Sequence, residues 1–273
     1  MSRSSTHPAH MHPIDRSIFD DLRAGFSQAK LWKFLAQREI ARQYDRTAIG
    51  VFWIPLNILF HFCLLGLVYS AVLGHSKGYF PYFALSYSIW TTFGRTLSES
   101  STLWRGSEKY LQQFSTPIST FINKSVYKLL LIFLISLPVG IVISLVTGAR
   151  PGFSVLLAIP GIVVYFANIY WIVTVLSIAS LRFRDLARFM PNIVFLVYLT
   201  TPILWQVTRL SEDKRWIAEI NPIYHLISLI RDPLLGHPAP MLSWIVCISG
   251  AIVGNIIAVW ALKAFRWRIP LWL

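Results

Sequence analysis

Long apolar runs alternate with short polar segments along most of the chain. Six of these runs have the length that a helix needs to cross the hydrocarbon core of a bilayer, about 20 residues. Between them lie glycine-containing or charged segments that end a helix at a membrane surface. The pattern predicts an all-α integral membrane protein with six transmembrane helices, at residues 50–73, 79–97, 125–147, 153–180, 186–207 and 241–262.

The residues before the first apolar run are polar and basic. Residues 1–13 are rich in serine, proline and histidine, and we expect a disordered leader there. From residue 14 to 49, apolar positions recur at helical spacing with charged residues between them, as at Ile18, Leu22 and Phe26. This region predicts one or two amphipathic helices on the membrane surface, ahead of a single transmembrane domain at 50–273.

Two longer polar segments separate predicted spans. Segment 98–124 is too long for a tight turn, and it predicts a short helix outside the bilayer between spans two and three. The segment between spans five and six is amphipathic from Trp216 to Leu235, and Asn221-Pro222 divides it. We expect a paired re-entrant or interfacial helical element there, because irregular backbone at membrane depth requires cover by protein or water.

Charge sets the expected orientation. The chain is 55% hydrophobic and only 14% charged, whereas soluble domains carry about 25% charged residues. Six spans place both termini on one side, and that side holds about three quarters of the 25 lysines and arginines. The positive-inside rule therefore predicts cytoplasmic termini, a cytoplasmic interfacial helix and a periplasmic element between spans five and six. The net charge of +13 is explained by topology rather than by nucleic-acid binding.

The junction 38–53 joins the basic region to the first span. Arg38, Arg42 and Arg46 are spaced by four residues, which places them on one face of a helix that would run directly into the span. One interpretation is a basic surface helix that meets an anion at the bilayer. The other is positive charge that merely orients the first span, and on charge alone this second interpretation is the simpler one.

The chain carries no motif for catalysis or energy supply. It has no phosphate-binding loop, dinucleotide fingerprint, zinc-protease motif or nucleophile elbow. No acidic residue lies at the middle of a predicted span, where an ion-coupled transporter usually keeps one. Cys63 and Cys247 lie in apolar runs, where cysteine behaves as a small hydrophobic residue. We therefore expect no catalytic residue, metal or cofactor in this chain, and an energy source on another chain.

Four short motifs occur in order along the chain, each at the end of a predicted span or in the outer element. They are Arg38-Glu39 with Arg42, Tyr44, Ile49-Gly50 and Trp53; residues 180–186; Thr201-Pro202-Ile203 with Trp205; and Asn221-Pro222-Ile223-Tyr224 with residues 231–236.

Together the motifs resemble the membrane subunit of ABC-2 type exporters that move lipid-linked polysaccharides, namely the O-antigen, capsule and teichoic acid permeases. The resemblance covers residues 14–268. Two positions depart from the usual pattern: Glu39 stands where the family often has aspartate, and Pro55 follows the tryptophan early.

The resemblance implies a function and partners. The chain would be a permease of the bacterial inner membrane that forms a homodimer with two copies of a separate ATPase, and ATP and magnesium would bind only to that ATPase. A channel between the two permease copies would carry the glycan. The helix in segment 98–124 would dock on the ATPase, with Arg105, Glu108, Lys109 and Tyr110 as coupling residues.

The resemblance also implies substrate contacts. Guanidinium groups bind phosphate in a bidentate manner, so the lipid pyrophosphate would meet the junction. The entrance residues would be Arg38, Arg42, Arg46 and Tyr44. Sugar rings stack on aromatic side chains, and the candidate channel aromatics are Tyr82, Phe83, Phe195, Tyr198 and Trp205. The periplasmic gate or lateral exit would contain Trp216, Asn221, Pro222 and Arg231.

Two alternatives stay open from the sequence. One is an ABC-2 exporter of a small lipid or drug, which shares every feature above except the glycan. The other is a membrane-embedded glycosyl or acyl transferase, which requires a reactive carboxylate or histidine near a membrane face. The candidates for that group are Glu99, His61 and His225.

Overall fold

A computed structural model describes residues 17–73, 78–105 and 116–272. Within these residues the regular structure is entirely helical, which confirms the all-α class. The helices are α1 (Ile18–Ser27), α2 (Ala29–Gln43), α3 (Trp53–Leu73), α4 (Tyr79–Ser100), α6 (Ile118–Val146), α7 (Ala158–Arg182), α8 (Arg184–Thr200), α9 (Trp216–Glu219), α10 (Pro222–Leu235), α11 (Met241–Phe265) and α12 (Ile269–Trp272). Short 3-10 turns lie at Gly50–Phe52, Phe153–Leu157, Val207–Arg209 and Glu212–Lys214.

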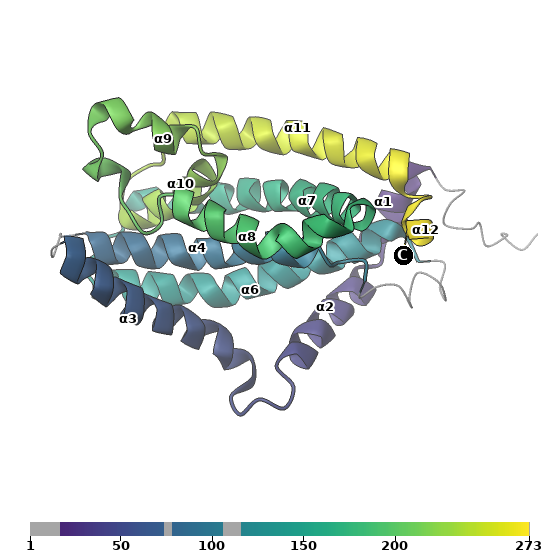
Figure 1. Cartoon of the computed structure of the whole chain (residues 1–273), viewed down its shortest axis with the longest axis horizontal. Helices are drawn as coiled ribbons and strands as arrows, with labels where there is room; N and C mark the ends of the chain where they lie inside the picture. The colour runs from purple at the N-terminus through teal and green to yellow at the C-terminus, as the bar shows by residue number, and fades with distance from the viewer. Residues whose placement is uncertain (1–16, 74–77, 106–115, 273) are drawn as a thin grey trace, which may run out of the picture.

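The long helices run along the longest axis of the molecule (Figure 1). Helices α1, α2 and α12 lie towards one end, and α9 and α10 lie at the other (Figure 1). The N-terminal helices and the element between α8 and α11 therefore lie at opposite ends of the bundle, as the sequence predicts.

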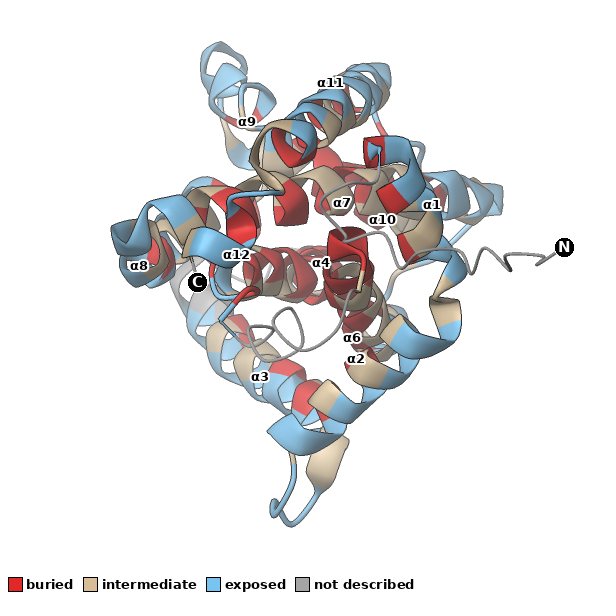
Figure 2. Ribbon diagram, turned by 90° about the vertical axis from the view of Figure 1, so that its right-hand side faces the viewer, coloured by how far each residue is buried: buried red, intermediate tan, exposed pale blue. Residues whose placement is uncertain are grey.

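Helix α4 forms the centre of the bundle (Figure 2). Its hydroxyl residues Ser88, Thr92 and Thr96 are completely buried between neighbouring helices. A Cβ atom at Gly140 of α6 would collide with the Ser88 hydroxyl, so glycine permits the close approach of α6 to α4. Buried hydroxyls and glycine thus lie within a core that also contains large side chains such as Phe83 and Phe133, and further large apolar side chains are exposed on the outside.

Four helical segments of the described chain are long and apolar enough to cross a membrane: Gly50–Val68, Ile118–Val146, Phe153–Arg182 and Met241–Phe265. They coincide with four of the six predicted spans. Helix α4 has 22 residues but is more polar than these four segments, and neighbouring helices bury most of its residues. Helix α8 has 17 residues, begins with Arg184 and Asp185, and ends before the predicted boundary at residue 207. The six-span arrangement therefore stays a prediction.

The junction between α2 and α3 is broken rather than continuous. Helix α2 ends at Gln43, and Arg46 has a positive φ of 61°. The Thr47 hydroxyl donates to the Tyr44 carbonyl at 2.8 Å and accepts from the Gly50 amide at 3.1 Å, which fixes a turn ahead of α3. The predicted shared helix face is therefore correct for Arg38 and Arg42 and wrong for Arg46, which lies beyond the end of the helix.

Helix α1 is anchored to the start of α6. The Asp21 carboxylate accepts hydrogen bonds from the Ile118 and Ser119 amides, each at 3.1 Å, and the Ser119 hydroxyl donates to the Asp21 carbonyl at 2.7 Å. Asp21 is 2% exposed. A carboxylate at this position satisfies amides that have no partner inside α6 and lies favourably at the positive end of the helix dipole.

The predicted outer element consists of two helices, α9 and α10, divided at Asn221-Pro222 as expected. The Asn221 side chain accepts from the Ile223 amide at 2.9 Å, and Pro222 occupies the first turn of α10. Asn221 also donates to the Thr201 hydroxyl at 3.1 Å, which links the start of α10 to the end of α8.

Candidate functional site

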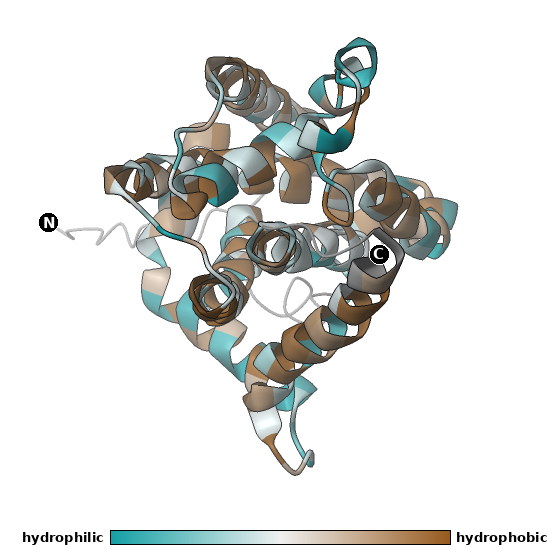
Figure 3. Cartoon of the chain, turned by 90° about the vertical axis from the view of Figure 1, so that its left-hand side faces the viewer, coloured by the Kyte–Doolittle hydropathy of each residue, from teal (hydrophilic) through white to brown (hydrophobic). Residues whose placement is uncertain are grey.

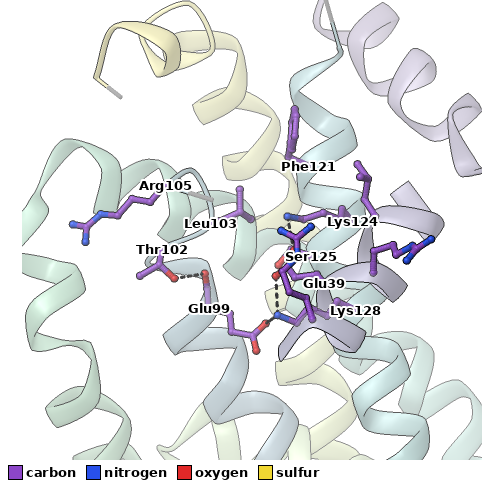
Figure 4. A pocket seen from close by; sticks show the side chains of 12 residues that line it. Glu39, Glu99, Thr102, Leu103, Arg105, Phe121, Lys124, Ser125 and Lys128 are labelled. Carbon is purple, nitrogen blue, oxygen red and sulfur yellow. Dashed lines mark hydrogen bonds and ion pairs between the residues drawn. The ribbon is translucent and has the colours of Figure 1, made fainter. Parts of the chain in front are cut away.

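A basic pocket of about 560 Å³ lies where α2, α4 and α6 meet. We call it the inner pocket, and Figure 4 shows its lining side chains. Helix α2 contributes one wall, the end of α4 and the turn after it contribute a second, and the first turns of α6 contribute the third. Its charged lining residues are Arg38, Glu39, Arg42, Glu99, Arg105, Lys124 and Lys128.

Lys128 joins the three walls of the inner pocket. Its ammonium lies 2.8 Å from Glu39 of α2 and 3.1 Å from Glu99 of α4, and its side chain is only 7% exposed. Lys124 pairs with the other Glu39 oxygen at 2.7 Å, and Arg95 lies 3.7 Å from Glu99. Both carboxylates of the pocket are therefore already paired with lysine or arginine side chains of the chain itself.

The lysines also determine the protonation of Glu39. Burial alone would raise the pKa of Glu39, but the charges and hydrogen bonds of Lys124 and Lys128 outweigh it and hold that pKa below its ordinary value. A lowered pKa stabilises the fold above the unfolded value of about 4.3, and this contribution is lost as the pH falls through the lower folded value.

A pH experiment tests this linkage. Wild-type protein should be more stable than Glu39→Gln at pH 7, and the difference should shrink as the pH falls below about 4.3. Thermal unfolding of both proteins in the same detergent across this pH range measures the effect. A difference that is constant with pH would show that the Glu39 charge contributes nothing to the fold.

Three guanidinium groups of the inner pocket have no carboxylate partner among the described residues. Arg38, Arg42 and Arg105 make no ion pair with another described residue, whereas both carboxylates are engaged. Arg38 and Arg42 are exposed on α2. An anion that enters the pocket therefore finds three available arginine side chains, which suit the oxygens of a phosphate group.

The remaining entrance residues lie apart from these three. Arg46 does not line the pocket, because it lies in the turn beyond the end of α2. Tyr44 accepts a hydrogen bond from Arg95 through its hydroxyl at 3.3 Å. The structure thus brings Arg38 and Arg42 together at the pocket, separates Arg46 from them, and connects Tyr44 to α4.

A polar stripe leads away from the inner pocket along α4. Tyr87, Thr91, Arg95 and Glu99 follow one another at intervals of four residues and are partly exposed on one side of this otherwise buried helix. The first three of these residues line a groove of about 430 Å³, which we call the lateral groove, and Glu99 lines the inner pocket. Residues of α3, α4, α6 and α8 line it, including Asn57, His61, Tyr87, Trp90, Thr91, Arg95 and Val194.

Aromatic rings gather beside this groove. The His61 and Tyr87 rings stack with centroids 5.3 Å apart. Tyr198 of α8 lies 5.5 Å from Trp90 and 6.2 Å from Tyr87 between ring centroids. Two of the predicted channel aromatics pack against these groove-lining rings: Tyr198, and Phe83, whose ring centroid lies 5.8 Å from that of Tyr87.

None of the predicted channel aromatics Tyr82, Phe83, Phe195 and Trp205 lines the lateral groove itself. Phe83 is completely buried and stacks on Tyr79, so it has a packing role in this structure. Tyr82 donates to the Pro202 carbonyl at 2.8 Å at the far end of the bundle. Phe195 is 59% exposed on the outside of α8, and Trp205 donates to the Leu199 carbonyl at 3.3 Å. Their contact with a glycan stays a prediction.

Sequence reasoning missed Tyr87, Trp90, Thr91 and Arg95 as members of one groove. The spacing of four residues between Tyr87, Thr91 and Arg95 is visible in the sequence. The side of α4 on which that stripe lies is not visible there, because it depends on how α3 and α8 pack.

The structure describes some of the predicted coupling residues and all of the predicted gate residues. Arg105 lines the inner pocket, whereas Glu108, Lys109 and Tyr110 lie outside the described residues. Among the gate residues, Asn221 and Pro222 begin α10, Trp216 is 60% exposed, and Arg231 is buried. The roles of these residues in coupling and gating stay predictions.

The residues considered for transferase chemistry are engaged in structural contacts. His225 is 2% exposed, and its two ring nitrogens contact the Ser243 hydroxyl at 2.9 Å and the Glu219 carbonyl at 2.7 Å. Glu99 is paired with Lys128. The Nδ1 atom of His61 lies 2.8 Å from the Asn57 carbonyl. The His225–Ser243 pair has hydrogen-bond geometry, but both residues are buried, at 2% and 0% exposure, so the pair packs inside the bundle rather than facing a substrate.

The chain is similar to known membrane proteins over most of its length. Residues 30–235 match the family described as ABC-2 type transporter. The chain is 20% identical over 230 residues to the O-antigen export system permease protein RfbA of Myxococcus xanthus, a match that covers 83% of this chain and 87% of that protein. Two Klebsiella pneumoniae proteins of the same name are 24% and 25% identical over 200 residues, covering 72% of this chain and 77% of each relative. The chain is therefore a multi-pass membrane transport subunit that belongs to the ABC-2 type transporter family.

Proposed function

We propose that this chain is the membrane subunit of an ATP-driven exporter that moves a lipid-linked polysaccharide, such as O-antigen or capsule, across the bacterial inner membrane. Three relatives that match most of the chain carry the name O-antigen export system permease. In this proposal α4 and α8 cross the membrane together with the four apolar segments, and both termini are cytoplasmic. The buried position of α4 supports its span, because neighbouring helices shield its polar residues from lipid.

The observation that carries the proposal is that the inner pocket and the lateral groove have lining residues that contact each other on α4, Glu99 and Arg95, which lie 3.7 Å apart. Glu99 lines the pocket and Arg95 lines the groove, one helical turn apart on α4. The lipid phosphates would bind Arg38, Arg42 and Arg105. The sugars would then follow the aromatic and hydroxyl side chains of the groove, which offer stacking surfaces and weak hydrogen bonds that permit sliding.

The proposal includes two kinds of protein partner. The lateral groove opens on a side of the bundle where α3 and α8 expose apolar residues such as Phe60, Phe195 and Leu196. A second copy of the chain would cover this side and close the groove into a channel, and the remaining apolar surface would face membrane lipids. Two copies of a separate ATPase would bind ATP and magnesium and dock near Arg105, where the chain leads into the predicted coupling helix.

A paired substitution tests the entrance. Replacing Arg38 and Arg42 together with glutamine should reduce glycan export by about tenfold or more, because each lost charge-assisted contact is worth about 1.5–3 kcal/mol. Arg46→Gln is the matched control, because Arg46 is exposed on the same segment but lies outside the pocket. Surface glycan is measured in cells that contain equal amounts of each permease.

The outcomes separate the two interpretations of the junction. Export that falls only in the Arg38→Gln/Arg42→Gln variant supports phosphate binding in the inner pocket. Unchanged export at normal protein level would contradict phosphate binding by these arginines, and their charge would then serve only to orient the first span. An equal loss in all variants would show that the total positive charge matters, rather than the pocket.

One observation favours the second candidate, a small-lipid or drug exporter. An apolar cavity of about 400 Å³ lies between α4, α7, α10 and α11, lined by residues such as Phe93, Trp171 and Leu226. A cavity of this kind suits an acyl chain or a hydrophobic drug. Stimulation of ATPase activity in the purified complex by small amphiphiles, with none by glycolipid, would favour this candidate over polysaccharide export.

A further inference from the structure

A second polar pocket lies at the end of the bundle opposite the inner pocket, the end that faces the viewer in Figure 3. We call it the outer pocket. Its volume is about 470 Å³, within the range of pockets that hold small molecules, about 300–1,000 Å³. The start of α4, the loop after α6, the segment after α8 and helix α10 line it. The residues used below are Tyr82, Arg150, Gln206, Tyr224, Arg231 and His237.

Arg231 is the rigid element of the outer pocket. It is 3% exposed, its Nε donates to Asp232 at 2.7 Å, and its Nη2 donates to the Ser228 hydroxyl at 3.3 Å. Its Nη1 is buried and donates to no other described residue. A buried N–H group without an acceptor costs free energy. A ligand in the pocket that Arg231 lines could supply the missing acceptor.

Two aromatic rings hold this guanidinium in place. Its Cζ lies 4.3 Å from the Tyr82 ring centroid and 5.7 Å from the Tyr224 ring centroid. Both tyrosines also line the outer pocket. Aromatic rings beside a fixed cation offer an apolar surface for a sugar ring and a charged partner for a group that the ring carries.

The charge of the outer pocket favours an anion. Its one carboxylate, Asp232, is engaged by Arg231 and by the Ser228 hydroxyl. Arg150 is exposed at the pocket and makes no ion pair with another described residue. The side chains of Gln206 and His237 add further hydrogen-bonding groups to the pocket lining. Water solvates the exposed Arg150 in the free chain, and an acidic ligand would replace that water with a charge-assisted hydrogen bond.

We propose that the outer pocket binds an acidic sugar unit, that is, a sugar ring bearing a carboxylate or phosphate. Arg150 and Arg231 would attract the anionic group, while Tyr82 and Tyr224 would contact the ring. The inference rests on the proposed function, because polysaccharide export is what brings sugar to this end of the chain. It narrows the substrate class to glycans that contain acidic residues.

Binding of small probes to the full-length permease in lipid nanodiscs tests the proposal. Calorimetric titrations would use glucuronate, glucose 6-phosphate, glucose and inorganic phosphate. Glucuronate or glucose 6-phosphate should bind at least about tenfold more tightly than glucose, as expected for a charge-assisted contact. Tighter binding of glucuronate identifies a carboxylate as the recognised group, and tighter binding of glucose 6-phosphate identifies a phosphate.

Two variants and a control locate the binding. Arg150→Gln and Arg231→Lys should each reduce the preference for the acidic probe by several-fold. Arg150 is exposed, so its substitution keeps the test valid if Arg231→Lys fails to fold. Lys214→Gln is the matched control, because Lys214 is exposed in the segment between α8 and α9 but does not line the pocket.

Three results would overturn the inference: glucose binding as tightly as the acidic sugars, inorganic phosphate binding as tightly as glucose 6-phosphate, or Arg150→Gln leaving the preference unchanged. These failures are separate from those of the proposed function. If the chain exports a glycan but the outer pocket binds no acidic probe, the inference fails and the proposed function stands. If acidic probes bind through Arg150 in a chain that exports no glycan, the proposed function fails, and the outer pocket is still a binding site for acidic sugars.

Discussion

Replacing Lys128 with methionine should lower the free energy of unfolding by about 3 kcal/mol, towards the lower end of the range for a broken buried ion pair. The Lys128 side chain is 7% exposed and neutralises Glu39 and Glu99 together. Methionine fills a similar volume but leaves Glu99 with only the longer Arg95 contact of 3.7 Å. The loss is limited because Glu39 keeps Lys124 and is 42% exposed. Export should fall as well, because the walls of the inner pocket lose their common contact.

A denaturant titration of each purified variant in the same detergent measures this change in the free energy of unfolding. Arg188→Met is the matched control, because Arg188 is 83% exposed and lies 4.0 Å from Asp185, so its loss should change stability by no more than about 0.5 kcal/mol. Adding Glu99→Gln to Lys128→Met should restore part of the lost stability, since the uncompensated carboxylate is removed. A Lys128→Met protein as stable as wild type would show that the cluster does not hold α2, α4 and α6 together.

Replacing Asp21 with alanine should cost about 2–3 kcal/mol, because hydrogen bonds to a charged group are lost and two buried amides are left without an acceptor. These are the amides of Ile118 and Ser119 at the start of α6. Asp21→Asn should cost less, because the amide oxygen still accepts one hydrogen bond. The damage should be local, at the point where the chain enters α6.

Hydrogen exchange locates the effect of Asp21. The amides of the first turn of α6 should exchange faster in Asp21→Ala than in wild type, while those of α11 should not change. Asp20→Ala is the control, since Asp20 is the exposed neighbour on α1. Equal protection of Ile118 and Ser119 in the Asp21→Ala protein would contradict the anchoring of α1 on α6.

Much of the fold is predictable from apolar length. The four segments that qualify as membrane-crossing helices all fall within or close to predicted spans, because burial in lipid requires a long continuous apolar run. The resemblance to a family also holds over most of the chain. Hydropathy does not identify α4 and α8 as membrane-crossing helices. Helix α4 carries polar residues that neighbouring helices bury, and α8 starts with charged residues.

The site was less predictable, for reasons that differ between residues. Arg38 and Arg42 lie on one helix, so their spacing was sufficient to group them. Arg46 shares their spacing of four residues but not their helix, because the turn beyond Gln43 depends on Thr47 and Gly50 rather than on charge. Lys128 lies 89 residues from Glu39, and no local pattern relates the two. Long-range contacts of this kind appear only when the helices are packed.

The bond between Asp21 and α6 has a consequence for how the protein is made. Its partners lie 97 residues apart, so α1 leaves the ribosome well before the residues that fix it exist. At typical synthesis rates that interval is roughly ten seconds. During this time α3 and α4 would enter the membrane while the amphipathic α1 and α2 wait at its surface. The first helix to be synthesised is thus secured only when the chain has reached α6, and the basic wall of the inner pocket is completed at that stage.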